Sequence, residues 1–135
     1  MNVDTLIINY LNDNNKNQNI IFNYVYNHLL IEFNINEINI TYIIDKDTLC
    51  CKNLDELLII IKNMYLSFEK FVNIIYNIKN MKIEYNHNSR IYCSINNIDI
   101  YFDIRELDIV SVNGGKLSID KLQGYLLSHG CKYKN

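Results

Sequence analysis

The sequence predicts an α+β fold: N-terminal helices and one long central helix pack on an antiparallel β-meander, and a C-terminal helix follows. Two observations carry this prediction. Apolar residues recur mainly at helical spacing up to about residue 79, and they alternate with polar residues between about residues 82 and 112. The chain has 135 residues and no internal repeat, which suits a single domain over residues 1–135.

The N-terminal third is expected to hold two helices and one strand. Residues 3–11 have helical spacing, and the polar run 12–19 is a loop. Over residues 21–33 the apolar positions match one face of an amphipathic helix of about four turns, namely Phe22, Val25, Tyr26, Leu29, Leu30 and Phe33. Residues 37–44 alternate as a strand does.

The central helix is predicted over residues 54–79. Asn53 is a suitable N-cap, and Glu56 stands where a capping-box partner belongs. Apolar residues then step by four and three, and neither proline nor glycine interrupts them before Asn80. The helix is either continuous, at about 39 Å for a rise of 1.5 Å per residue, or broken near Ser67.

The meander is predicted from four strands, over residues 82–85, 90–95, 98–104 and 107–112. Only Asn96-Asn97 separates the middle two, and asparagine tolerates the positive φ of a two-residue hairpin turn. The register follows from this turn. On the buried face it pairs Ile95 with Ile98, Cys93 with Ile100 and Ile91 with Phe102, and on the open face Tyr92 with Tyr101 and Arg90 with Asp103.

The C-terminal part begins with a tight turn at Asn113-Gly114-Gly115. Ser118 is expected to cap a last helix over residues 119–128. Gly130 stands where a left-handed residue ends a helix.

The composition points to an AT-rich genome. The chain has 24 Ile, 23 Asn, 11 Lys and 11 Tyr, but no Ala or Pro, and A/T-rich codons specify the favoured residues. Large DNA viruses, some phages, several parasites and intracellular bacteria have such genomes, and among these we expect a viral or phage factor. The formal net charge of −2 is too balanced to indicate nucleic acid or an anionic membrane as the partner.

The four cysteines are expected to be free thiols. Cys50 and Cys51 are adjacent, and neither they nor Cys93 and Cys131 have zinc-site spacing. The sequence shows neither a signal-peptide pattern nor an uninterrupted apolar span. We therefore expect an intracellular, cytoplasmic protein, in an infected host cell if the origin is viral.

The sequence contains no recognisable catalytic, cofactor or metal motif, so we expect a non-enzymatic protein without a cofactor. Asp99 and Asp103 share a strand face about 13 Å apart at roughly 3.3 Å per residue, too far apart for one metal ion. His129 and Cys131 flank Gly130, so a thiol–imidazole pair is not expected there.

The function expected from the sequence is protein binding. The open face of the meander offers two tyrosines among charged residues, and its candidate contact residues are Arg90, Tyr92, Asp99, Tyr101 and Asp103. The alternative is nucleic-acid binding through the C-terminal helix and nearby lysines, namely Lys116, Lys121, Lys132 and Lys134. A contiguous basic surface would favour nucleic acid, and a mixed surface would favour a protein.

Self-association is a further expectation. The central helix is apolar over a wide stripe, and one short helix and the meander are not expected to cover all of it. A homodimer would cover the remainder, with a seam at Phe68, Phe71, Ile75 and Ile78.

Overall fold

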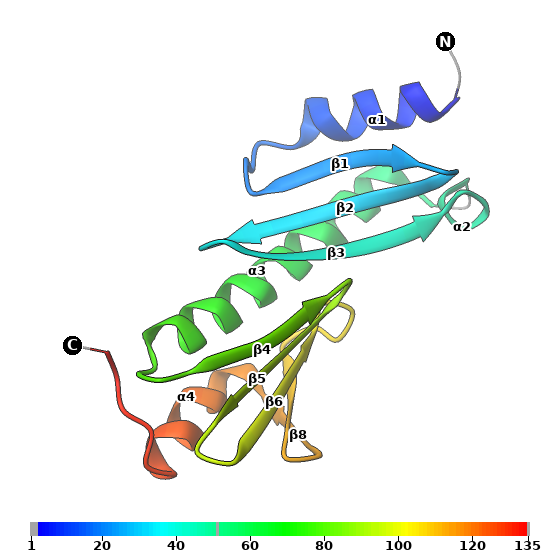
Figure 1. Ribbon diagram of the computed structural model, residues 1–135. Helices are drawn as coiled ribbons and strands as arrows, with labels where there is room; N and C mark the ends of the chain where they lie inside the picture. Colours follow the sequence, from blue (N-terminus) through cyan, green and yellow to red (C-terminus); the bar gives the residue numbers. More distant parts are fainter. Residues whose placement is uncertain (1–2, 51, 135) are drawn as a thin grey trace.

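The structure is a computed structural model, and it describes residues 3–50 and 52–134, without the side chain of Cys50 (Figure 1). These residues form four helices and two antiparallel sheets, so the α+β prediction is confirmed. Helix α1 (Val3–Asn14) precedes a three-stranded sheet with the order β1-β2-β3. A short helix α2 (Lys46–Cys50) and the long helix α3 (Leu54–Asn77) lead into a five-stranded sheet with the order β4-β5-β6-β7-β8, and helix α4 (Ile119–Ser128) follows.

The predicted helix over residues 21–33 is wrong. This segment forms strands β1 (Ile20–Val25) and β2 (His28–Ile35), joined by a turn at Tyr26-Asn27 in which both residues have positive φ. Strand β3 (Ile38–Asp45) confirms the strand that was predicted over 37–44. The apolar residues alternate between the two faces of the strands, and the buried ones are Ile20, Phe22, Leu29, Ile31, Phe33, Ile38, Ile40 and Ile44.

Helix α3 is continuous through Ser67. Asn53 caps it by accepting hydrogen bonds from the backbone N–H groups of Asp55 and Glu56, at 2.9 and 3.2 Å. Ser67 is buried, and its hydroxyl accepts a 3.1 Å hydrogen bond from the backbone N–H of Asp108. The serine therefore joins the helix to the loop that precedes β7 and does not interrupt the helix.

The five-stranded sheet contains the predicted hairpin. Strands β5 (Arg90–Ile95) and β6 (Ile98–Asp103) pair in the expected register around Asn96-Asn97, whose φ angles are 48° and 63°. Strands β4 (Lys82–His87) and β7 (Ile109–Val112) flank them. A fifth strand, β8 (Gly115–Ser118), was not predicted and pairs with β7 across the Asn113-Gly114 turn.

The C-terminal helix has the predicted bounds. Ser118 is its N-cap residue, although its side chain makes no capping hydrogen bond. Gly130 has a φ of +90° just after the helix, as expected of a left-handed terminator.

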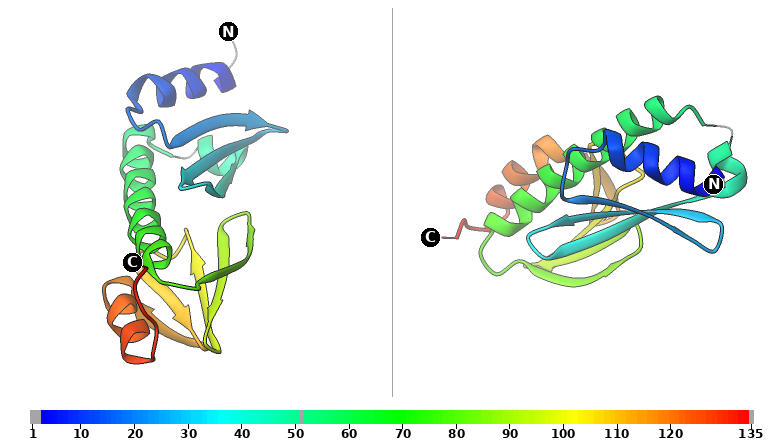
Figure 2. Two further views of the ribbon diagram at one scale, coloured as in Figure 1. Left: turned by 60° about the vertical axis from the view of Figure 1, so that its left-hand side comes forward. Right: turned by 90° about the horizontal axis from the view of Figure 1, so that it is seen from above.

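Both sheets pack on the same side of α3, one against each half of the helix (Figure 2). Phe68 joins the two halves, because its ring lies 6.4 Å from the ring of Phe33 on β2 and 6.1 Å from that of Phe102 on β6. The ring of Phe71 stacks on that of Phe102 at 4.6 Å. The buried residues of both sheets and of the helices thus form one hydrophobic cluster.

The predicted seam for self-association is not open. Phe68, Phe71 and Ile78 are fully buried and Ile75 is 2% exposed, all within a single chain. The segment 21–33 forms part of a second sheet instead of one short helix, and this sheet, the five-stranded sheet and helix α4 all contribute to the cluster that contains these residues. Ile78 also pairs with Tyr133 of the C-terminal segment. These four side chains are therefore already covered within one chain and offer no exposed seam.

The helices do not resemble membrane spans. Among the described residues, no helix is both long enough and apolar enough to cross a bilayer.

Candidate functional site

The outer face of the five-stranded sheet carries a row of three tyrosines. Tyr85 on β4, Tyr92 on β5 and Tyr101 on β6 are register partners across neighbouring strands. The rings of Tyr92 and Tyr101 stack at 4.6 Å with planes 10° apart, and those of Tyr85 and Tyr92 lie 5.5 Å apart. Tyr85 and Tyr101 remain 48% and 42% exposed. We call these three residues the tyrosine row.

A β-bulge places Tyr85 in this row. Ile83 pairs with the buried Cys93, and the register then shifts so that Tyr85, two residues later, pairs with Tyr92 on the opposite face. In a regular strand Ile83 and Tyr85 would share a face. Sequence reasoning missed Tyr85 for this reason, since no signal in the sequence reveals the extra residue.

Asp99 fixes the position of the central tyrosine. The Tyr92 hydroxyl donates a 2.6 Å hydrogen bond to the Asp99 carboxylate. This hydrogen bond, followed by desolvation and the negative charge of Asp99, raises the pKa of Tyr92 to about 12. The hydrogen bond therefore ties the hydroxyl of the central ring of the row to Asp99, while the ring itself stacks on Tyr101.

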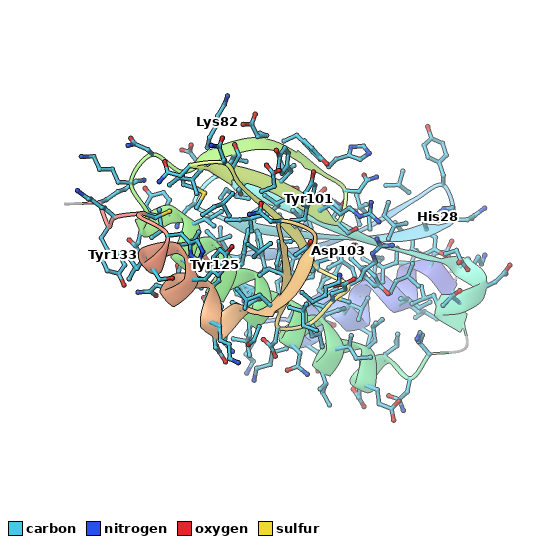
Figure 3. The ribbon with its side chains drawn as sticks, turned by 90° about the horizontal axis from the view of Figure 1, so that it is seen from below. His28, Lys82, Tyr101, Asp103, Tyr125 and Tyr133 are labelled. Atoms are coloured by element: carbon cyan, nitrogen blue, oxygen red, sulfur yellow. The ribbon has the colours of Figure 1, made fainter. Side chains whose placement is uncertain are left out.

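Asp103 gathers both arginines of the chain at one end of the row. Arg90 donates from Nε to Asp103 at 3.2 Å, and Arg105 donates from Nε and Nη2 at 3.0 and 2.7 Å. Burial alone would raise the pKa of Asp103, but the hydrogen bonds from Arg105 and Arg90 outweigh it, so this pKa is lowered. Tyr101 and Asp103 lie close together in Figure 3, away from the end of the molecule that carries Tyr125 and Tyr133.

Arg105 was also missed by the sequence analysis. Its backbone N–H donates a 2.9 Å hydrogen bond to Asp103, two residues earlier. A turn in which an aspartate side chain accepts a hydrogen bond from the backbone N–H two residues later is common. The spacing Asp103-x-Arg105 is therefore the signal in the sequence that places Arg105 beside Asp103.

The charges on this face balance one another. Lys116 lies 2.8 Å from Glu106, Lys82 lies 3.6 Å from Glu84, and the arginines bond to Asp103. The register of β5 and β6 places the five predicted contact residues on one face, together with these ion pairs. The face is mixed in charge, not basic.

The C-terminal lysines do not all point to one basic surface. Lys116 pairs with Glu106 on the outer face of the sheet, whereas the Lys134 ammonium lies 4.5 Å from the centre of the Tyr76 ring at the end of α3. These two lysines therefore belong to different surroundings.

His129 and Cys131 have separate partners. The His129 ring stacks on Tyr125 at 4.0 Å, and its Nδ1 lies 2.8 Å from the Tyr125 carbonyl oxygen. Cys131 is buried and lies beside the Asn96 side chain. Cys93 and Cys131 are free thiols, whereas the predicted free thiols at Cys50 and Cys51 lie outside the described side chains.

Metal ligands do not gather in the described parts of the chain. No group of three or more His, Cys, Asp or Glu side chains there is placed to hold an ion.

Comparison with known proteins gives no relative: the chain matches no protein-family model, no curated protein and no solved structure.

Proposed function

We propose that this protein is a non-enzymatic binding protein, and that the outer face of its five-stranded sheet contacts a protein partner. The observation that carries the proposal is the tyrosine row, with two tyrosines more than 40% exposed beside charges that balance one another. Tyrosine and arginine are enriched among the residues that dominate protein–protein interfaces.

The same face is poorly suited to nucleic acid. Base stacking needs a free aromatic ring face, and the rings of Tyr92 and Tyr101 cover one face of each other. A nucleic-acid backbone is bound by a continuous basic surface, whereas cations and carboxylates are mixed here: Arg90 and Arg105 share Asp103, and Lys116 pairs with Glu106. Both features favour a protein partner.

The two classes of partner can be separated without knowing the natural one. A displayed library of random peptides is selected on the wild-type protein and then on Tyr101→Ala. Tyr26→Ala serves as the matched control, because Tyr26 is 92% exposed in the β1–β2 turn, outside the five-stranded sheet. We expect enriched peptides that bind the wild type and Tyr26→Ala alike and lose binding to Tyr101→Ala.

The alternative is tested in parallel by fluorescence anisotropy with single-stranded and double-stranded oligonucleotides at low and physiological salt. Salt-dependent oligonucleotide binding that Lys121→Gln weakens, together with a library that enriches nothing, would contradict the proposal.

A further inference from the structure

The junction between the two sheets contains a cleft that holds both arginines of the chain. Strand β3 meets the β4–β5 turn here, where the Thr41 N–H donates a 2.8 Å hydrogen bond to the Asn88 carbonyl. The cleft has a volume of about 280 Å³, and Tyr42, His87, Arg90 and Arg105 are among its lining residues. It therefore brings a positively charged pair to the end of the tyrosine row.

The two guanidinium groups keep most of their hydrogen-bonding capacity. Each arginine has five N–H donors. The structure assigns one donor of Arg90 and two donors of Arg105 to side-chain bonds, all of them to Asp103. Arg90 and Arg105 are 63% and 50% exposed, so an incoming anion can reach the remaining donors.

Asp103 holds the pair in place. It is only 17% exposed, and it binds Arg105 through two parallel hydrogen bonds while it also accepts from Arg90. Two cations around one carboxylate leave a net charge of +1. Asp103 therefore orients the two guanidinium groups but neutralises only one of their charges, and one further negative charge would neutralise the site.

We propose that the cleft binds a carboxylate, and that the protein partner supplies it from an aspartate or glutamate side chain. This inference rests on the proposed protein-binding function and deepens it, because it gives the partner an acidic residue beside the segment that contacts the tyrosine row. A carboxylate carries one charge and two oxygens in a plane, which suits the forked donors of a guanidinium group. Thr41 and Ser89 also line the cleft and offer hydroxyl groups.

Nuclear magnetic resonance tests the site directly, because the chain has only two arginines, Arg90 and Arg105. Their Nε–Hε groups give two signals in the spectrum of the ¹⁵N-labelled protein. The probe is the capped tripeptide acetyl-Gly-Glu-Gly-amide, and the same tripeptide with Gln is the neutral control. We expect both signals to shift saturably with the acidic probe, with a Kd on the order of millimolar, and not with the neutral one. The absence of a saturable shift, or an equal shift with the Gln probe, would overturn the proposal.

Asp103→Asn separates an oriented site from simple attraction. This variant loses the negative charge of Asp103, so the net charge around the two arginines becomes more positive. Electrostatic attraction alone therefore predicts tighter binding of the acidic probe. If Asp103 orients the arginines, binding weakens instead, and we expect at least a tenfold loss in Asp103→Asn and in Arg90→Lys. Lys116→Gln removes a positive charge from the same face outside the cleft and should leave the Kd unchanged. Tighter binding by Asp103→Asn would overturn the proposal.

Two further results keep this inference distinct from the proposed function. Inorganic phosphate that displaces the acidic tripeptide at a lower concentration than acetate would overturn the assignment to a carboxylate. If the tripeptide does not bind while the library still yields peptides that depend on Tyr101, the cleft assignment is wrong and the proposed function stands.

Discussion

Phe68→Ala should destabilise both halves of the protein at once. Phe68 is fully buried in the middle of α3, and its ring packs between Phe33 of the three-stranded sheet and Phe102 of the five-stranded sheet. Truncation of a buried phenylalanine to alanine typically costs about 3–5 kcal/mol of unfolding free energy. Each lost aromatic pair is worth about 0.5–1.5 kcal/mol beyond its buried area, which places this site in the upper part of that range.

Chemical denaturation followed by circular dichroism and by tyrosine fluorescence measures this loss. The matched control is Leu66→Ala, two residues earlier on the same helix but 43% exposed, which should cost less than about 1 kcal/mol. Hydrogen exchange should show weaker protection in β2 and in β6 together. A loss below about 1 kcal/mol for Phe68→Ala, or weaker protection in one sheet alone, would refute the conclusion that Phe68 joins the two sheets.

Three other predictions concern single side chains. In the folded protein the Cys93 thiol should react slowly with Ellman's reagent at pH 8, because burial raises its pKa to about 12. The unfolded, unreduced chain should show four reactive thiols. A fast reaction of Cys93 in the folded protein, or fewer than four thiols in the unfolded chain, would contradict this prediction. Asp99→Asn should lower the pKa of Tyr92, which ultraviolet difference titration against Tyr92→Phe measures, and an unchanged titration would show that the Asp99 bond does not control that pKa. Asn97→Val should lower the free energy of unfolding by about 1–2 kcal/mol, because residue 97 has a φ of 63°, whereas Asn97→Gly should not; equal stability of the two variants would contradict the turn assignment.

The C-terminal half was predictable because local signals agreed there. Alternation over residues 90–103 and a two-residue Asn-Asn connection left one register that buries Cys93 and Phe102, and the structure has that register. The same register predicted two residue pairs of the candidate site, namely Arg90 opposite Asp103 and Tyr92 opposite Tyr101.

The N-terminal sheet was missed because its apolar residues fit two periods. In the segment 20–33, positions such as Phe22, Leu29 and Phe33 match a helical face as well as two alternating strands. The feature that separates the two strands is the turn at Tyr26-Asn27, and in a chain with 23 asparagines a single Asn is weak evidence for a turn. Every two-residue turn in the two described sheets contains an asparagine with positive φ, namely Asn27, Asn36, Asn88, Asn96 and Asn113.

Other features of the site depend on contacts distant in the sequence. The cleft needs β3 to lie beside the β4–β5 turn, and the contact between Thr41 and Asn88 joins residues from two different sheets. The local spacing of apolar and polar residues along the sequence does not reveal a contact between two sheets. The full burial of Phe68 was missed for the same reason, because its ring also packs against Phe33 of a sheet that was not predicted from the sequence.

The measurement that tests the central claim most directly is site-specific photo-crosslinking in cells that naturally produce the protein. A photoreactive phenylalanine analogue replaces Tyr101 on the outer face of the five-stranded sheet, or Tyr26 in the β1–β2 turn as the exposed control. We expect a discrete protein adduct from position 101 that is missing from position 26 and that Arg90→Ala diminishes. Adducts with nucleic acid at position 101, or the same adducts from both positions, would contradict the conclusion that this face binds a protein partner.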